Sequence, residues 1–371
     1  MPLASQRLEY LPALTGLRGV AAGLVLGFHA WGYAGRPRLD LGDEGLSYPL
    51  HALAGIGFLG VDLFFVLSAF LLSQPFLAAA VGRRPWPDLR TFYVRRMRRV
   101  LPAFWAQLAL LVAIGWVIGG APPLDLRSVV SHALFLQFMV PGVSQINAVY
   151  WSLPVEWWFY FTLPVIGWAF GRARWWLLLL LAVVAAATFR LACWHWLHEG
   201  QRHPWANYES IMHLRARLDQ FLIGIVAAWF HLKVARDAPV RAACAVAGML
   251  GLLLLAPSLA ARGDLFVEVD YPYVLFHYPL VGTLWALVVF GAAGQVRWIE
   301  AMLGNRVLRW IGLVSFSLYL WHYPVFKGVH DAGIYLRLGV GLASLLALVA
   351  SLLLAWLSYW FIERPFLRDR N

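Results

Sequence analysis

Ten separate runs of about twenty mostly apolar residues recur along this chain, and they constrain its fold more than any other feature. A helix needs about 20 apolar residues to cross the hydrocarbon core of a bilayer, where it satisfies its own backbone hydrogen bonds. With 61% hydrophobic and 13% charged residues, the sequence predicts an all-α polytopic membrane bundle of about ten transmembrane helices in a single domain, residues 1–371. The runs lie at 12–33, 52–79, 100–120, 148–170, 174–196, 211–231, 239–258, 274–293, 307–326 and 336–361.

The distribution of arginine and lysine sets the predicted orientation. With the N-terminus in the cytoplasm, 19 of the 30 basic residues fall in inner segments and seven in outer segments. Cytoplasmic loops of membrane proteins are enriched in these residues, so we expect both termini to be cytoplasmic. This pattern also accounts for the net charge of +11 without nucleic acid, which we do not expect as a partner. We interpret the first run as a retained helix, not a signal peptide, because Arg18 lies inside it.

The two cysteines give no sign of redox or metal chemistry. Cys193 and Cys244 fall in separate predicted spans and form neither a CxxC pair nor a disulfide framework. We therefore expect no metal cofactor. We find no internal repeat in the sequence and expect no appended soluble domain, so we expect the chemistry to come from the bundle and its loops.

The first run contains two ionisable residues at helical spacing. Arg18 and His29 are eleven residues apart, which is close to three turns, so both side chains are expected on one helix face about 16 Å apart along the axis. Ionisable groups inside a membrane helix are costly, at about 2.5–3.5 kcal/mol near its centre, and they usually mark a functional path. These two residues are therefore candidates for a functional site.

Two carboxylates lie in later runs. Asp62 lies ten residues into the second run and needs a donor partner, for which Arg18 and His29 are the nearest candidates in sequence. An internal ion pair and a catalytic role both stay open for Asp62. Glu156 follows Pro154, where we expect an interruption of the helix backbone bonding, and a carboxylate beside such an interruption can line a cavity.

The inner segment from Arg83 to Arg99 is the strongest electrostatic feature. Four arginines fall within a turn and a half just before the third run, namely Arg95, Arg96, Arg98 and Arg99. Guanidinium groups bind phosphate oxygens bidentately, so such a helix face suits a ligand with several phosphates. Anchoring to anionic lipid headgroups explains the same arginines equally well.

Six segments of the chain carry recognisable motifs: Leu14 to Ala22 with His29, Phe64 to Phe70, Arg95 to Arg99, Trp151 to Glu156, Ser317 to Pro324 and Phe361 to Phe366. Taken together, these segments resemble the acyltransferase-3 family of integral membrane acyltransferases. Two positions depart from the family pattern: Ala69 stands where the family usually has glycine, and Trp157 where it commonly has a second acidic or polar residue. The departures concern helix packing near Ser68 and the cavity beside Glu156.

The resemblance implies transfer of an acyl group, most often acetyl from cytoplasmic acetyl-CoA, to a hydroxyl of a glycan, glycolipid or other small acceptor in a bacterial inner membrane. On this basis we expect His29 to act as general base, oriented or polarised by Asp62 or Glu156. We expect direct transfer, without an acyl-enzyme on Ser68. The expected CoA-binding residues are Arg18, Arg95, Arg96, Arg98 and Arg99, and the expected cavity residues are Ser68, Trp151, Ser152, Tyr319 and His322.

A transporter or flippase of a sugar-containing or lipid-like substrate is the alternative. It would also place charged residues near mid-membrane and use a broken helix beside its substrate. Against it, the chain shows no repeat-related halves. The sequence leaves open the acceptor, the length of the acyl group, and whether the protein is a monomer or a homodimer.

Overall fold

The computed structural model describes residues 11–36, 54–118, 125–199, 212–234, 237–261 and 271–367, and these residues form helices and connections with no β-strand. The predicted all-α class is therefore confirmed. The long helices are α1 (Pro12–Tyr33), α3 (Leu59–Ala80), α4 (Leu89–Ile118), α6 (Ser152–Phe170), α7 (Trp175–Glu199), α9 (Leu214–Lys233), α10 (Ala238–Ala261), α11 (Tyr271–Ala292), α13 (Arg306–Asp331) and α14 (Ile334–Ser358). Shorter elements are α5 (Leu126–Ala133), α12 (Arg297–Leu303), α15 (Arg364–Leu367), a 3-10 turn (Ala148–Trp151) and a π-helical turn (Tyr359–Glu363).

Each of the ten predicted spans coincides with one long helix. Within the described part of the chain, seven helical segments are both long and apolar enough to cross a membrane: α1, α3, α4, α7, α10, α11 and the stretch from α14 through α15. Helices α6, α9 and α13 have sufficient length but a lower mean hydropathy, and they are not among these seven. In α9, for example, Arg215, Arg217 and Asp219 lie within the first two turns. The protein is thus a polytopic helical bundle, and its orientation stays a prediction.

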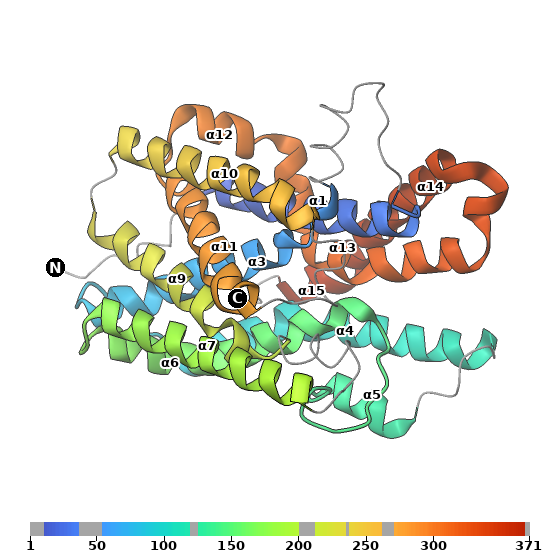
Figure 1. Cartoon of the computed structure of the whole chain (residues 1–371), viewed down its shortest axis with the longest axis horizontal. Helices are drawn as coiled ribbons and strands as arrows, with labels where there is room; N and C mark the ends of the chain where they lie inside the picture. Colours follow the sequence, from blue (N-terminus) through green and yellow to red (C-terminus); the bar gives the residue numbers. More distant parts are fainter. Residues whose placement is uncertain are drawn as a thin grey trace.

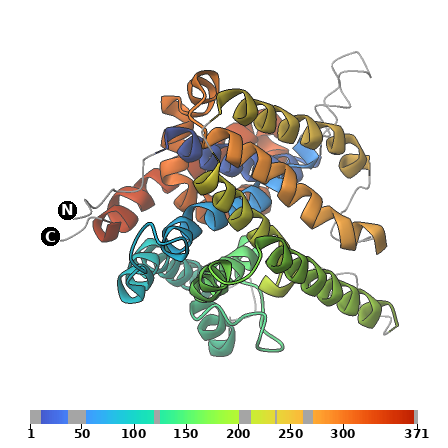
Figure 2. The same ribbon diagram turned by 90° about the vertical axis from the view of Figure 1, so that its left-hand side faces the viewer.

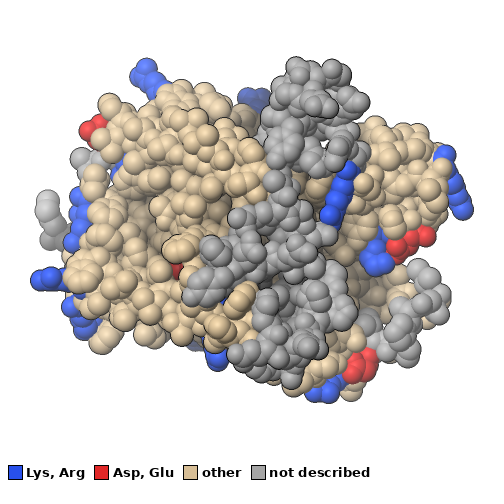
Figure 3. All heavy atoms as spheres, in the orientation of Figure 1, with Lys and Arg blue, Asp and Glu red and all other residues tan. Residues whose placement is uncertain are grey.

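Helices α3 and α9 occupy the middle of the bundle. Figures 1 and 2 both show α4, α5, α6 and α7 on the lower side and α1, α10 and α12 on the upper side, with α3 and α9 between them. On the face shown in Figure 3, a broad uncharged surface covers α7, α10 and α11, and the lysine and arginine atoms gather mainly at its edges. This distribution suits helices that face lipid along their middles and water at their ends.

Helices α1 and α13 pack closely and run in the same direction. A Cβ atom added to Gly312 would lie 1.9 Å from the Thr15 carbonyl oxygen, and one added to Gly19 would lie 2.2 Å from the Leu308 carbonyl oxygen. Only glycine fits at such a backbone approach, which is a common way for membrane helices to pack. This contact fixes the register of α1 against α13, and both helices contribute to the site described below.

Helix α4 begins at Leu89, earlier than the predicted run at 100–120, so Arg95, Arg96, Arg98 and Arg99 belong to this helix. Asp88 caps this helix, because its carboxylate accepts hydrogen bonds from the Thr91 backbone N–H at 2.9 Å and from the Thr91 hydroxyl at 2.5 Å. These bonds lower the pKa of Asp88. The hydropathy pattern missed this start because the first turns of α4 are rich in arginine.

Candidate active site

A cavity of about 1010 Å³ opens between α3, α4 and α6, with further walls from α1 and α13. This volume is at the upper end of the usual range for small-molecule sites. Apolar residues of α3, such as Leu67 and Leu71, line one side. The polar lining residues are Arg18, Ser68, Arg84, Asp88, Thr91, Arg95, Arg96, Arg99, Glu156 and Tyr160.

One side of this cavity is strongly cationic. We call the following four residues the arginine wall: Arg18 of α1 and Arg95, Arg96 and Arg99 of α4. The Nε atoms of Arg18 and Arg96 are buried and have no hydrogen-bond partner among the described residues. Arg98 is exposed and does not line the cavity, so the structure separates it from the other predicted arginines. Arg84 lines the cavity as well, and the sequence analysis had not singled it out.

Arg99 is held in place by a residue from the far end of the chain. Its Nη1 atom lies 2.7 Å from Oε2 of Glu363, which is 1% exposed. The Ser317 hydroxyl donates to the other oxygen of Glu363 and lies 2.9 Å from the Ser358 hydroxyl. Glu363 ends the π-helical turn, an irregularity that often occurs at functional positions. Glu363 belongs to the last of the segments that resemble the family, but the sequence predicted no role for it.

Ser68 and Glu156 meet at the inner end of the cavity. The Ser68 hydroxyl donates to Oε1 of Glu156 at 2.5 Å, joining α3 to α6. The expected interruption at Pro154 is absent: Pro154 lies in the first turn of α6, which starts at Ser152, where a missing N–H costs no hydrogen bond. Glu156 lines the cavity as predicted, although an intact helix carries it there.

Beyond Ser68 and Glu156 the cavity continues as a narrow extension of about 50 Å³, which we call the neck. Tyr319 lies at its end: the Tyr319 hydroxyl donates to the Val149 carbonyl oxygen at 2.8 Å and lies 2.7 Å from the Ser152 hydroxyl. Ser152 and Tyr319 therefore line this space, and their predicted role in a substrate cavity stays a prediction. The neck is lined by Arg18, Val61, Phe64, Phe65, Ser68, Ser152, Leu153, Glu156, Ser315, Phe316 and Tyr319.

His29 and His322 face each other across α1 and α13. Nε2 of His322 lies 3.2 Å from Nδ1 of His29, and the ring centroids are 4.9 Å apart. Neither residue lines the cavity or the neck. Along α13, Phe316 lines both the cavity and the neck, and Tyr319 lines the neck. His322 lies one turn beyond Tyr319 and six residues, or about 9 Å, beyond Phe316. The cavity, the neck and the histidine pair thus follow one another along the bundle.

The bonding pattern assigns the tautomers of the histidine pair. Nδ1 of His322 lies 3.0 Å from the Leu318 carbonyl oxygen, so this nitrogen carries the proton and Nε2 is an acceptor. Nδ1 of His29 lies 3.0 Å from the Val25 carbonyl oxygen and faces the acceptor Nε2 of His322, so it also carries a proton. The Nε2 lone pair of His29 is therefore free to accept a proton from another group.

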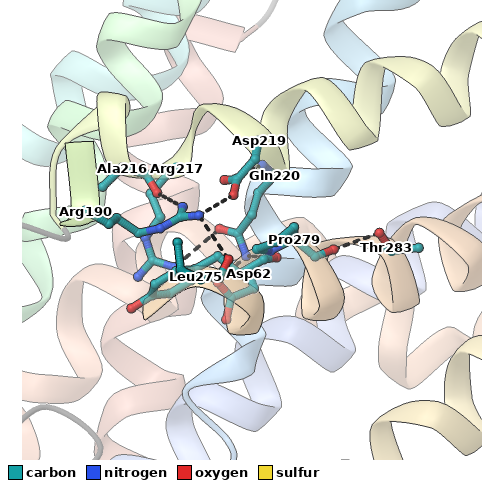
Figure 4. A network of polar contacts seen from close by, with 10 residues as sticks. Asp62, Arg190, Ala216, Arg217, Asp219, Gln220, Leu275, Pro279 and Thr283 are labelled. Atoms are coloured by element: carbon teal, nitrogen blue, oxygen red, sulfur yellow. Dashed lines mark hydrogen bonds and ion pairs between the residues drawn. The ribbon is translucent and has the colours of Figure 1, made fainter. Parts of the chain in front are cut away.

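The expected pairing of Asp62 with Arg18 or His29 is wrong. Its Oδ1 atom lies 3.1 Å from Nη1 of Arg217 and accepts a hydrogen bond of 2.8 Å from the Gln220 side chain. All three residues are buried, and Figure 4 shows them beside a second ion pair, Arg190 with Asp219, whose closest atoms are 2.9 Å apart. A local hydropathy pattern cannot indicate this partner, because Arg217 lies 155 residues further along the chain.

Among the expected cavity residues, Trp151 and His322 lie elsewhere. Trp151 packs edge-on against Phe65 with ring centroids 6.1 Å apart, outside the lining of both cavity and neck. His322 pairs with His29 as described. Ser68 lines the cavity and the neck, and Ser152 and Tyr319 line the neck. Within the described part of the chain, no cluster of three or more metal-ligating side chains forms.

Comparison with known proteins gives one family and a set of distant relatives. The profile of the acyltransferase domain family, type 3, matches residues 11–360. The peptidoglycan O-acetyltransferase OatA of Listeria monocytogenes is 25% identical over 379 residues, which cover 96% of this chain and 56% of that protein. A Bacillus subtilis protein named "Putative peptidoglycan O-acetyltransferase YrhL" is 27% identical, covering 97% and 55%. A Staphylococcus aureus protein named "Putative O-acetyltransferase" is 24% identical, covering 98% and 58%.

This chain therefore spans little more than half the length of these curated relatives. No solved structure matches it. The matched range includes α1 with Arg18 and His29 and α13 with Tyr319 and His322.

Proposed function

Because this chain belongs to the acyltransferase-3 family, we propose that it is a multi-pass O-acetyltransferase of the bacterial inner membrane. It moves an acetyl group from acetyl-CoA to a hydroxyl of a glycan, glycolipid or other small acceptor. The observation that carries this proposal is the series formed by the arginine wall, the neck and the histidine pair. The name of the Listeria relative, a peptidoglycan O-acetyltransferase, supports a glycan hydroxyl as the first acceptor to test.

The arginine wall is our proposed site for the CoA phosphates. Acetyl-CoA is a co-substrate with a phosphate-rich end and a long, thin, uncharged arm. Arginine binds phosphate through two parallel hydrogen bonds, and the buried Nε atoms of Arg18 and Arg96 supply donors that lack partners among the described residues. Along α1, Arg18 and His29 are about 16 Å apart, a distance comparable to the length of the CoA arm. The arm would therefore extend from the cavity along α1, past Ser68 and Glu156, and bring the thioester toward His29.

His29 is our proposed general base. Its free Nε2 atom takes the proton from the acceptor hydroxyl while that oxygen forms a bond to the thioester carbonyl carbon. The carbon–sulfur bond then breaks, and the CoA thiolate leaves and takes up the proton. General bases of this kind contribute roughly 10²- to 10⁴-fold in rate. His322, not Asp62 or Glu156, contacts His29, so we assign to His322 the role of orienting the base.

The two carboxylates receive different proposed roles. Glu156 holds the Ser68 hydroxyl at the entrance to the neck, where both side chains contact the arm of the donor. Asp62 lies in a buried ion pair with Arg217, and breaking such a pair usually costs several kcal/mol because one charge is left uncompensated. We therefore assign Asp62 to the packing of α3 against α9.

The test follows free CoA released from acetyl-CoA by the purified protein in detergent, with and without peptidoglycan fragments as acceptor. Wild type is compared with His29→Ala and with His330→Ala, which removes an exposed histidine from α13 as a matched control. We expect release to depend on His29 and not on His330, with acetyl-CoA binding retained in both variants.

Two other outcomes would change the proposal. A His29→Ala protein that turns over at nearly the wild-type rate would remove His29 from the mechanism. Absence of any acetyl-CoA binding by the folded wild-type protein would contradict the proposed donor site and favour the transporter or flippase.

A further inference from the structure

A second hollow lies on the other side of α6 from the donor cavity. This groove has a volume of about 720 Å³ and opens between α6, α7, the start of α9 and the segment after α5. It shares no lining residue with the cavity or the neck. Helix α6 separates the two sites: Glu156 and Tyr160 face the cavity, whereas Pro154 and Trp158 face the groove.

The long wall of the groove is apolar and aromatic. Along α6 it extends from Pro154 to Ile166, twelve residues or about 18 Å. Phe161 is 45% exposed and Val165 is 66% exposed, so this wall is open along its length. Phe189 of α7 closes the other side. An open apolar channel of this length on a membrane-spanning bundle suits a long hydrocarbon chain.

One end of the groove is cationic. His213 packs edge-on against Phe138 and Phe189, and the Arg215 guanidinium lies 5.9 Å from the centre of the Phe189 ring. Neither His213 nor Arg215 makes a side-chain hydrogen bond or ion pair with another described residue, and no carboxylate occurs among the described residues that line the groove. Both side chains stand at the start of α9, where the helix dipole also favours an anion.

The cationic end lies at the same end of the bundle as the histidine pair. Helix α3 runs parallel to α9, because Asp62 contacts Arg217 while Ala69 contacts Gly224. Helix α3 runs antiparallel to α1, because Gly57 approaches Leu24 and Phe28 while Gly60 approaches Ala21. The starts of α3 and α9 therefore lie beside the end of α1 that carries His29.

We propose that this groove binds a membrane lipid with a long hydrocarbon chain and a phosphate headgroup, with the chain along α6 and the phosphate on Arg215 and His213. Such a lipid can carry a glycan acceptor and hold it in the plane of the membrane, here at the end of the bundle that also holds the histidine pair. The proposed lipid binding rests on the groove alone. The proposed role of this lipid in carrying the acceptor rests on the proposed acetyl transfer.

The test measures lipid retention by the full chain in a delipidating detergent, using native mass spectrometry and no acetyl-CoA. The probes are dioleoyl phosphatidic acid and dioleoylglycerol, which have the same chains and differ in the phosphate. We expect one phosphatidic acid per protein and no retained dioleoylglycerol. Arg215→Ala should reduce retention about fivefold, which corresponds to about 1 kcal/mol for one cation near a lipid phosphate.

Two further variants separate the groove from the general lipid surface. Arg172→Ala removes another exposed arginine, at the opposite end of the α6–α7 hairpin, and should leave retention unchanged. Val165→Trp fills the groove and should abolish retention without removing a charge.

Equal retention of the two lipids, or unchanged retention in both Arg215→Ala and Val165→Trp, would show bulk annular lipid only and overturn the proposal. Because no acetyl-CoA is present, this result does not depend on whether acetyl transfer occurs.

Discussion

Arg96 and Arg98 of α4 form a matched pair that separates donor binding from membrane anchoring. Both carry the same charge on the same helix, two residues apart, so replacing either with alanine removes the same positive charge from the same membrane interface. Two residues correspond to about 200° around a helix. Arg96 accordingly lines the cavity, whereas Arg98 is exposed outside it.

The structure gives the expected size of the effect. The Nε atom of Arg96 is buried with no partner among the described residues, so a phosphate oxygen there makes a new charged hydrogen bond. Such bonds contribute about 1.5–3 kcal/mol, which corresponds to an increase in the KM for acetyl-CoA of about 10- to 100-fold in Arg96→Ala. Arg98→Ala should change the KM by less than about twofold, and kcat should be nearly unchanged in both.

The assay is the release of free CoA at varied acetyl-CoA concentration, with membrane insertion and protein yield measured in parallel. The effect of Arg96→Ala should persist at 0.5 M salt, because a partly buried pair is screened less than an exposed one. Equal KM shifts in Arg96→Ala and Arg98→Ala would refute the assignment of the cavity. A change only in insertion or orientation would show that these arginines serve as anchors.

Two further predictions test the histidine pair and the helix contact beneath it. His322→Ala should lower kcat about 10- to 100-fold with little change in the KM for acetyl-CoA, as expected when a group that orients a catalytic histidine is lost; an equal loss through KM would instead indicate a role in donor binding. Gly312→Ala should destabilise the protein by about 1–3 kcal/mol in thermal unfolding, because the new Cβ would overlap the Thr15 carbonyl oxygen. Gly328→Ala, on the same helix with nothing within 4 Å of the new atom, is its control, and similar unfolding temperatures for the two variants would contradict the close packing.

The helices of this protein could be predicted well because a membrane span is encoded locally. Each needs only a long apolar run, and the ten predicted runs coincide with ten long helices. The predicted start of α4 was wrong for a related reason. The first turns of this helix carry arginines, so the hydropathy pattern does not mark its beginning, which is set by the capping carboxylate of Asp88.

The candidate site could be predicted only in part, because a local sequence pattern does not show which helices that are far apart in sequence come into contact. Arg18 and His29 were recognisable from their spacing on one helix. The partner of His29, by contrast, is 293 residues away, and that of Arg99 is 264 residues away. Asp62 illustrates the same limit, since its partner lies on α9 and not on the neighbouring α1.

The small size of the neck has a consequence for the membrane as a barrier. A protein that takes its donor from one aqueous side and serves an acceptor toward the other risks a continuous file of water, and hence a proton leak. The neck has a volume of about 50 Å³, and the hydroxyl of Tyr319 at its end is bound to both Val149 and Ser152. So small a space holds only a few water molecules. The neck therefore limits the amount of water that could connect the cavity with the histidine pair.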